Sequence, residues 1–390
     1  MSTPTLTLKP REERRLLNGH LWVFSNEIQT VDSSAGRGDV VRVSSAAGKL
    51  MGVAIYNPNS LIAARLIDRE DVPLDGDWFR SRIRRALRLR EMLFPGSSTY
   101  RLLHSESDGV PGVIVDRFNE VMSVQIAAAG MEARRDLLFD ALMEIEGVSG
   151  VVERNDHQLR VLEGLPERVG LVRGTADVQQ ISDGIIRYQM DPLGGQKTGA
   201  YLDQRTNRIA MRRFMGAGQV LDLFCNDGGF ALHAADAGAE RVIAVDSSAA
   251  AIRSLQSNCM LNNLAQIQGR ENDVFSELHD RRSQGEQFAA VIADPPPFAR
   301  SKKHIAAARK RYVELFSLAV QVTAPDGVAF LATCSHHITR DTLLEMVREA
   351  LRKSRRECVI LEERGASPDH PVHPAMPETG YLHGVILRVG

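Results

Sequence analysis

The feature that most constrains the fold is a regular alternation of strand-like and helix-length segments from about residue 185 onward. Strands that alternate with helices predict a doubly wound parallel sheet, because each parallel connection needs a crossover. We therefore expect an α/β fold with a Rossmann-like domain over residues 181–390. The predicted strands are I-I-R-Y-Q-M (185–190), Q-V-L-D-L-F (219–224), R-V-I-A-V-D (241–246), A-A-V-I-A-D (289–294) and V-A-F-L-A-T-C (328–334).

Two further domains are expected before this one, since 390 residues are enough for several cores. Residues 1–75 contain short strand-like runs with Gly and Pro turns between them, which predict a small β-barrel. Residues 76–180 predict a compact α+β domain. The predicted elements are strands at 40–43, 51–56 and 62–67, an arginine-rich helix over 77–92, a hairpin of 112–117 with 121–126, a helix over 132–145 and a strand at 148–154.

The composition is that of a globular protein and disfavours several functions. No apolar run reaches the roughly 20 residues of a membrane helix, and the first nine residues lack the blocks of a signal peptide. We therefore expect a cytoplasmic protein that does not contact membranes. Cys225, Cys259, Cys334 and Cys358 form no CxxC or Cys/His pattern, so we expect neither a disulfide framework nor a metal site.

The carboxyl ends of the predicted parallel strands are the expected ligand site. After the strand that begins at residue 219, Gly228 and Gly229 permit a close backbone approach at a helix N-terminus. The next strand ends in Asp246, where an acid can accept both ribose hydroxyls of an adenosine. Asn272 and Asp273 follow in a position to reach an adenine.

The acidity of the turn after residue 223 distinguishes between cofactor classes. A dinucleotide enzyme is expected to carry G-x-G-x-x-G, which accommodates a pyrophosphate, whereas Asp222 and Asp227 would repel phosphates. These carboxylates suit the positively charged amino end of S-adenosylmethionine. We therefore predict this cofactor, held also by Phe224 and Asn226 of the turn, and keep a nicotinamide cofactor as the alternative.

The reacting site is predicted at the next two strand ends. D-P-P-P-F (294–298) holds Asp294 at a rigid break, because prolines cannot continue a ladder. Cys334 ends the following strand and is a candidate nucleophile. A thiolate that adds to C6 of cytosine makes C5 reactive toward a methyl sulfonium, while Asp294 can hydrogen-bond the ring at N3. The alternatives are a simple strand terminator for the proline motif and a packing residue for Cys334.

Two basic segments are candidate phosphate contacts on a chain whose formal net charge is −1. The predicted helix over 77–92 spaces several arginines along its length. Residues 300–311 contain no acid and directly follow D-P-P-P-F, which places them at the mouth of the predicted site. A solvated helix face is the alternative for the first segment. The arginines of that helix are Arg80, Arg82, Arg84, Arg85, Arg88 and Arg90.

Several motifs together carry a resemblance to a known family: N-G-H-L-W-V-F-S-N-E-I (18–28), D-G-V-P-G-V-I-V-D-R (108–117), Q-K-T-G-A-Y-L-D-Q-R-T-N-R (196–208), L-D-L-F-C-N-D-G-G-F (221–230), D-P-P-P-F, T-C-S (333–335) and D-H-P (369–371). Over essentially its whole length the chain resembles the bacterial large-subunit ribosomal RNA cytosine-C5 methyltransferases of the I/O type. The resemblance implies a PUA RNA-binding domain (1–75), a central α+β domain (76–180) and a class I methyltransferase domain (181–390).

The resemblance implies methylation of C5 of one cytosine in 23S rRNA, either free or in a large-subunit precursor, with Cys334 as the nucleophile. It also implies that Tyr201, Asp203 and Gln204 lie near the cofactor or target base, and that the chain tends to form a homodimer. Methylation of an amino group of adenine or cytosine, and a non-catalytic RNA-binding assembly factor, are the alternatives.

Two features depart from the family pattern or are left open by it. After T-C-S the chain has His336 and His337, which are candidates for lowering the pKa of the Cys334 thiol. The base that removes the C5 proton is left open among Asp203, Asp369 and His370, each of which is equally compatible with a structural role.

Overall fold

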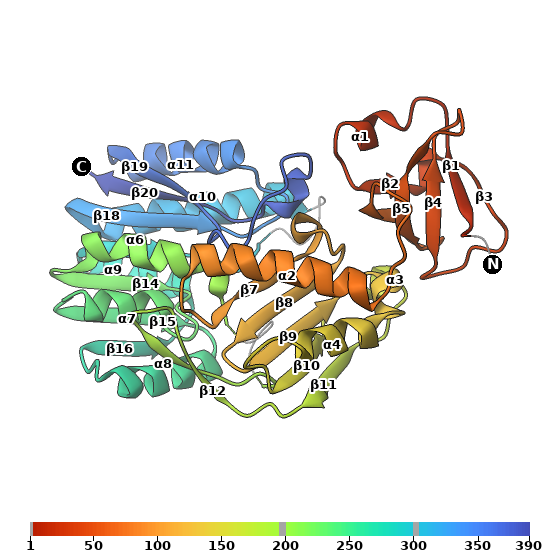
Figure 1. The fold of residues 1–390 in the computed structure, drawn as a ribbon. Helices are drawn as coiled ribbons and strands as arrows, with labels where there is room; N and C mark the ends of the chain where they lie inside the picture. The colour runs from red at the N-terminus through yellow and green to blue at the C-terminus, as the bar shows by residue number, and fades with distance from the viewer. Residues whose placement is uncertain (1–2, 195–199, 299–303) are drawn as a thin grey trace. The chain divides into compact units, whose positions relative to one another are not determined.

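Two compact units make up the part of the chain that the computed structural model describes, which is residues 3–194, 200–298 and 304–390 (Figure 1). A short segment near the C-terminus belongs to the first unit, although the chain on either side of it belongs to the second. In the described ranges no helix is both long and apolar enough to cross a membrane. The first unit is Met1–Ile181, Met190–Leu202 and Pro368–Thr379, and the second is Ser182–Gln189, Asp203–Ser367 and Gly380–Gly390.

The first unit contains two larger sheets. Neighbouring strands are antiparallel except for the parallel pairs β1–β4 and β9–β10. The six-stranded sheet has the order β2 (Trp22–Phe24), β6 (Ile62–Asp68), β5 (Leu50–Tyr56), β4 (Val40–Ser44), β1 (Thr5–Leu8), β3 (Ile28–Val31). The five-stranded sheet has the order β11 (Arg168–Gly174), β10 (Gly150–Asn155), β9 (Val121–Ile126), β8 (Val113–Phe118), β7 (Thr99–His104).

The helices of the first unit pack mainly on the five-stranded sheet. The longest, α2, begins where the Asp75 side chain accepts a hydrogen bond from the Trp78 N–H at 3.0 Å. Its apolar face buries Phe79 and Ile83 in one core with α4 and the sheet. The predicted arginine-rich helix and the predicted hairpin, β8 with β9, are confirmed. The helices are α1 (Arg14–Leu17), α2 (Gly76–Leu93), α3 (Ala129–Glu132), α4 (Arg135–Met143) and α5 (Leu159–Leu162).

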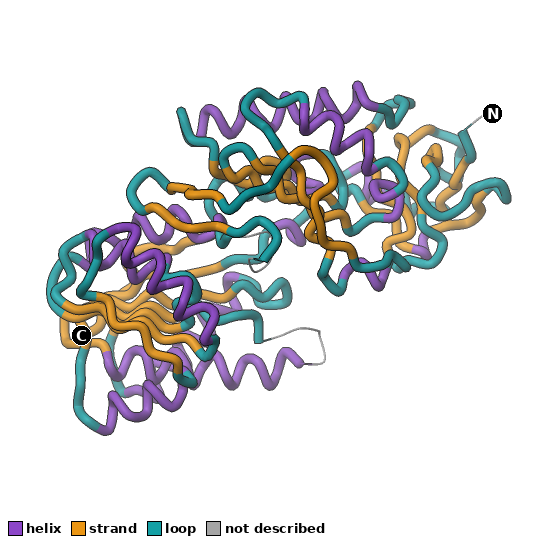
Figure 2. The backbone as a smooth tube through the Cα atoms, turned by 90° about the horizontal axis from the view of Figure 1, so that it is seen from below, coloured by secondary structure: helices purple, strands orange, loops and turns teal. Residues whose placement is uncertain are grey.

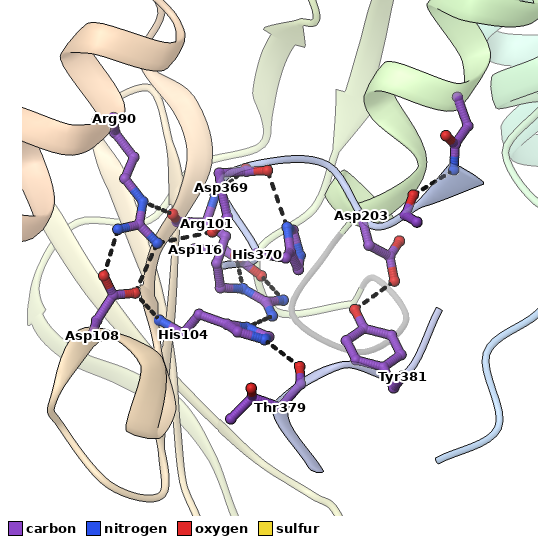
Figure 3. Close-up of polar contacts among 12 residues, drawn as sticks. Arg90, Arg101, His104, Asp108, Asp116, Asp203, Asp369, His370, Thr379 and Tyr381 are labelled. Carbon is purple, nitrogen blue, oxygen red and sulfur yellow. Dashed lines mark hydrogen bonds and ion pairs between the residues drawn. The ribbon is translucent and has the colours of Figure 1, made fainter. Parts of the chain in front are cut away.

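One arginine of α2 is fully buried and holds several chain segments together (Figure 3). Arg90 donates to both carboxylate oxygens of Asp108, at 2.6 and 2.8 Å. It also donates to the backbone carbonyls of Arg101, at 2.7 Å, and Asp369, at 2.8 Å. A buried charge is tolerated when it is paired and hydrogen-bonded, as here. Arg90 is therefore structural, and its predicted place among phosphate contacts is wrong.

The second unit is built on a seven-stranded sheet (Figure 2). Six of its strands run in the same direction, and β20 is antiparallel to both of its neighbours. The strand order is β16 (Ile267–Glu271), β15 (Arg241–Asp246), β14 (Gln219–Leu223), β17 (Phe288–Ala293), β18 (Thr323–Thr333), β20 (His383–Val389), β19 (Cys358–Gly365). The helices are α6 (Arg205–Met215), α7 (Gly229–Asp236), α8 (Ala249–Asn262), α9 (Val274–Ser283), α10 (Ile305–Val322) and α11 (Arg340–Ser354).

Helices cover both faces of this sheet, which confirms the predicted α/β class. Helices α6, α7 and α8 form one core with Val220 of β14, while α9, α10 and α11 form another with Leu221 and Leu223. Because side chains alternate along a strand, Asp222 points to the same face as Val220, toward α7. From β14, the next strands along the chain, β15 and β16, are added on one side, and β17 and β18 are added on the other side. Parallel sheets bind ligands at such a change in strand order, which here lies between β14 and β17.

Part of the predicted strand pattern is wrong. The segment expected as a strand of the large sheet at 185–190 forms β13 (Arg187–Met190), which lies in a separate two-stranded sheet with β12 (Gln179–Ser182). Two strands of the large sheet, β16 and β20, were not predicted as members of it. β16 lies at an edge and none of its residues is fully buried, so its apolar signal is weak. β20 is an interior strand with several buried apolar residues, so its absence from the prediction has no such explanation.

Replacing Arg90 with Met should destabilise the first unit, because Asp108 would then be a buried carboxylate without its counter-charge. We expect the free energy of unfolding to fall by about 3–5 kcal/mol. Both tryptophans of the chain, Trp22 and Trp78, belong to this unit, so urea unfolding followed by tryptophan fluorescence reports on it. The matched control is Arg88→Met on the same helix, which is exposed and should change stability by less than about 0.5 kcal/mol. Equal effects of the two variants would contradict a structural role for Arg90.

Candidate active site

The carboxyl ends of the four central parallel strands meet at one edge of the sheet. Leu223 of β14 is opposite Val245 of β15 and Ala293 of β17, and Ala293 is opposite Leu331 of β18. The residues that directly follow these positions therefore lie along one edge. The predicted site residues Phe224, Asp246, Asp294 and Cys334 are all within three residues of them, which confirms the placement expected from the strand order.

The turn between β14 and α7 has an unusual backbone. Phe224, Asn226 and Gly228 have φ angles of +61°, +46° and +89°. A positive φ is strained for a bulky side chain such as Phe, and such residues cluster at functional sites. At Gly228 a Cβ would overlap the side chain of Leu255, so both the backbone angle and the packing require glycine. The predicted glycine turn is present and tightly constrained.

Asp246 ends β15 and holds this turn in place. Its Oδ2 accepts the Asn226 N–H at 3.0 Å, and its Oδ1 accepts the Ser248 N–H at 2.9 Å. Each carboxylate oxygen has a second lone pair, so both remain able to accept a hydroxyl. The geometry therefore fits the predicted contact of Asp246 with a ribose.

Asp222 is almost completely buried, with 1% of its surface exposed. Its Oδ2 accepts the Ala231 N–H of α7 at 2.9 Å. Burial raises the pKa of Asp222 to about 8, and the carboxylates of Asp294 and Asp246 add to the rise. The side chain is therefore largely protonated at neutral pH, and a nearby cation would favour its ionised form.

Asn272 and Asp273 lie at the same edge, and their side chains make local hydrogen bonds. The Asn272 amide donates to Glu277 Oε2 at 2.7 Å. Asp273 caps α9, because its Oδ1 accepts the Ser276 N–H at 2.9 Å. These bonds fix the start of α9, and the predicted contact of both residues with an adenine stays a prediction.

A cluster of aromatic rings at this edge was not predicted. The Phe298 ring of D-P-P-P-F lies 4.7 Å from Tyr312, 6.3 Å from Phe224 and 6.4 Å from Phe275, between ring centroids. The Arg311 guanidinium lies over Phe298 at 5.1 Å from its centroid. Apolar and aromatic side chains with a few polar groups are the usual lining of a small-molecule site.

Cys334 follows the last residue of β18 and is half-buried. Its Sγ donates to the backbone carbonyl of Pro295, at 3.6 Å, so the thiol lies beside D-P-P-P-F. The residues on either side are anchored: Thr333 is fully buried, and Ser335 is bonded to the Tyr312 hydroxyl at 3.0 Å. The thiol therefore lies beside the backbone of Pro295, the residue that follows Asp294.

The other cysteines are in positions that suit packing, as expected. Cys225 belongs to the core beneath α7, and burial raises the pKa of its thiol well above the usual value. Burial also raises the pKa of Cys259 to about 11, and it raises that of Cys358. Thiols that resist ionisation are poor nucleophiles.

Asp203 and Gln204 also belong to the second unit, at the start of α6. Asp203 is 5% exposed and its Oδ2 accepts the Tyr381 hydroxyl at 2.7 Å (Figure 3). The Tyr381 ring packs against His336, with centroids 5.2 Å apart. Gln204 is buried, and the described residues offer its Nε2 no hydrogen-bond partner. Tyr201 belongs to the first unit, so its predicted role stays a prediction.

Asp369 and His370 are parts of the first unit and are buried in its polar network (Figure 3). Asp369 Oδ2 accepts the Arg101 N–H at 2.8 Å, and Oδ1 lies 3.0 Å from His370 Nδ1. Arg101 in turn forms an ion pair with Asp116. These contacts give Asp369 and His370 a structural role, because they attach the D-H-P segment near the C-terminus to the rest of the first unit.

Two predicted features lie partly outside the described residues. These are the Q-K-T-G portion of 196–208, and residues 300–303 of the acid-free segment. In the remainder of that segment, Arg309 forms an ion pair with Glu345 at 2.8 Å. Among the described residues, no group of three or more His, Cys, Asp and Glu side chains is arranged to hold a metal ion.

Comparisons with known proteins agree with this architecture. A PUA-like domain model matches residues 6–69, and the model described as conserved hypothetical protein 95 matches residues 206–322. A candidate SAM-dependent methyltransferase from Streptococcus mutans has a TM-score of 0.84 at 21% identity, covering 98% of this chain and 99% of that one. A candidate methyltransferase solved with SAH has a TM-score of 0.85 at 20% identity and the same coverage.

The fold and the arrangement of strand ends are those of a class I methyltransferase with an N-terminal PUA-like domain. The chain is 35% identical over 396 residues to the ribosomal RNA large subunit methyltransferase I of Tolumonas auensis, with 100% of both chains covered. It is 36% identical over 393 residues to that of Shewanella frigidimarina, covering 98% of this chain and 99% of the relative. The chain belongs to the family of the ribosomal RNA large subunit methyltransferases I, as its motifs predicted.

Asp222 should make the stability of the cofactor-free protein depend on pH. The folded protein keeps a proton on Asp222 up to a pKa of about 8, whereas the unfolded chain releases it near pH 4. Stability should therefore decrease as the pH rises through this range. In thermal unfolding at several pH values, Asp222→Asn should show a smaller decrease than the natural protein. The exposed Asp280→Asn is the control and should leave the slope unchanged. Parallel curves for all three proteins would contradict the raised pKa.

Proposed function

We propose that the chain is an S-adenosylmethionine-dependent methyltransferase that modifies C5 of one cytosine in 23S rRNA through a covalent adduct between Cys334 and C6. The observation that carries this proposal is the hydrogen bond of the Cys334 thiol to the Pro295 carbonyl. This contact supports the proposal because it brings the thiol to the D-P-P-P-F motif, at the edge where parallel sheets bind ligands.

The second unit has groups suited to each part of S-adenosylmethionine, which supplies an electrophilic methyl group when bound. Asp246 retains acceptor capacity for the ribose hydroxyls. The rings of Phe224, Phe275 and Phe298 form an apolar wall suited to an adenine. The SAH bound to the structural relative agrees with this cofactor.

The chemistry uses the thiolate as a temporary substituent of the base. The Cys334 thiol loses its proton, its sulfur bonds to C6, and the electron pair of the C5–C6 double bond becomes available at C5. C5 then takes the methyl group as the bond between that methyl and the sulfonium sulfur breaks, which leaves the electron pair on the sulfur of S-adenosylhomocysteine. A base then removes the C5 proton, the double bond forms again, and the C6–S bond breaks to return the thiolate. Asp294 is the group that we propose to hydrogen-bond the ring at N3.

Asp203 is the base that we propose for the C5 proton. Of the three candidates, Asp369 and His370 are engaged in a structural network. Asp203 accepts from Tyr381, whose ring packs against His336, two residues from Cys334. The hydrogen bond from the Tyr381 hydroxyl would orient the Asp203 carboxylate for removal of the C5 proton.

The RNA partner is supported by basic side chains on α2. Arg80 and Arg82 form ion pairs with neighbouring acids, while Arg84, Arg85 and Arg88 are exposed. Exposed arginines on successive turns of a helix suit contacts to phosphates, which position a protein without reading sequence. The relatives named as ribosomal RNA large subunit methyltransferases agree with this substrate class. The homodimer implied by the resemblance stays a prediction.

Replacing Cys334 with Ala should abolish methyl transfer to 23S rRNA, because no other group can form the C6 adduct. The affinity for SAH, measured by calorimetry, should change by less than about twofold, because the thiol acts on the base. Cys358→Ala, at another half-buried cysteine, is the matched control and should retain activity. Nuclease digestion and mass spectrometry of the product should identify 5-methylcytidine.

Methyl transfer by Cys334→Ala at the rate of the natural protein would contradict the proposed mechanism. A product methylated on an exocyclic amino group would support the alternative mechanism, which needs no cysteine. An intact chain that binds RNA but not SAH would instead support a non-catalytic assembly factor.

A further inference from the structure

Arg208 of α6 is a buried arginine whose guanidinium lies over the Tyr188 ring, 5.9 Å from its centroid, and lacks, among the described residues, the ion pair that such a group normally has. Only 9% of its surface is exposed. The described residues offer its Nε no hydrogen-bond partner, and none of the ion pairs within the described part of the chain includes Arg208. Buried guanidinium groups are normally paired, because removing a charge from water without compensation is very unfavourable. This arrangement indicates an anion that binds from outside the chain.

The guanidinium faces the N-terminus of α7. A Cβ at Gly229, the first residue of that helix, would overlap the Arg208 side chain, so glycine is required here for close approach. The first N–H groups of a helix lack intrahelical partners and favour negative charge. Arg208 and this helix end therefore attract an anion to the same place, beside the turn that follows β14.

An unsatisfied acid lies next to the unsatisfied arginine. The described residues offer Asp227 Oδ1, which is buried, no hydrogen-bond partner. Asp227 and Arg208 are close enough to perturb one another: burial raises the pKa of Asp227, and Arg208 lowers it. The other acid near Arg208 at this end, Asp183, is already bonded to His233, at 2.7 Å, and to Tyr188, at 2.9 Å. Arg208 Nε and Asp227 Oδ1 thus each lack a hydrogen-bond partner among the described residues.

We propose that Arg208 and Asp227 together bind the zwitterionic amino acid end of the cofactor, Arg208 taking its carboxylate and Asp227 its ammonium group. This assignment rests on the proposed use of S-adenosylmethionine. It adds Arg208, which lies outside the glycine turn, to the residues predicted for the cofactor. A phosphate would meet repulsion from the Asp227 carboxylate, whereas a zwitterion satisfies both signs of charge.

The test compares ligands that differ only in the carboxylate. Calorimetry with the full chain would measure the affinity for SAH and for the methyl ester of SAH, which keeps the ammonium group but has no negative charge. The natural protein should bind SAH about tenfold to a hundredfold more tightly than the ester, the range expected for hydrogen bonds to a charged group. This comparison needs no variant and so does not depend on the folding of one.

Arg208→Gln should lose most of that preference. Its affinity for SAH should fall by about tenfold or more, while its affinity for the ester should be nearly unchanged. Arg212→Gln is the matched control on the same helix, because Arg212 is paired with Asp236 at 2.7 Å and should not affect either ligand. Gly229→Ala should weaken SAH binding in the same way as Arg208→Gln, because its methyl group would displace the guanidinium.

Two results would overturn the assignment. The first is equal binding of SAH and its ester by the natural protein. The second is an equal loss of affinity for both ligands in Arg208→Gln, which would make Arg208 a structural counter-charge for Asp227. If the natural protein bound neither SAH nor its ester, the proposed use of S-adenosylmethionine would be contradicted. This outcome is distinguishable from the two results above, in which SAH still binds the natural protein.

Discussion

The in-register parallel pairing of β15, β14, β17 and β18 is the constraint on which the site depends. It brings the carboxyl ends of four strands to one edge, although the residues that follow them are far apart in sequence. This pairing alone brings four features to the same edge of the sheet, without further long-range contacts among them: Asp246, the glycine turn, Asp294 and Cys334. The two cores on either side of the sheet stabilise the pairing, because alternate residues of each strand are buried on opposite faces.

Buried charges play different roles in the two units. In the first, Arg90 makes four hydrogen bonds, two of them to Asp108, and the network is complete without a ligand. In the second, Arg208 is buried and Asp227 is half-buried, and each keeps one buried atom without a hydrogen-bond partner among the described residues. A satisfied network stabilises the fold, whereas an unsatisfied pair is costly unless something binds to it. This contrast separates structural arginines from the one that we assign to the cofactor.

Local sequence patterns predicted those elements that are determined by neighbouring residues in the chain. The central strands, the hairpin of β8 and β9, helix α2 and the glycine turn follow from apolar runs and turn residues. Tertiary contacts decided the rest. Arg90 and Arg88 belong to the same arginine-rich helix, yet one is buried and the other exposed. Arg208 was part of a recognised motif, but its proximity to Gly229 appears only when α6 packs against α7.

The predicted strand at 185–190 shows a further limit of sequence patterns. Ile186, Tyr188 and Met190 are buried, as the pattern indicates, but the strand in this segment lies outside the large sheet. Conversely, the edge strand β19 alternates half-buried and exposed residues and gives a weak signal. Apolar periodicity reports that a segment is buried on one face, and it does not report which sheet the segment joins.

The covalent role of Cys334 is the central claim, and trapping of its adduct tests it most directly. In RNA that contains 5-fluorocytidine at the target position, fluorine replaces the C5 proton, so no base can complete the elimination and the C6–S bond persists. We expect a complex that survives denaturation, in which mass spectrometry finds the modified nucleotide on the peptide that contains Cys334. Failure to trap any complex with RNA that is methylated normally when it contains cytidine, or an adduct on another residue, would contradict the account.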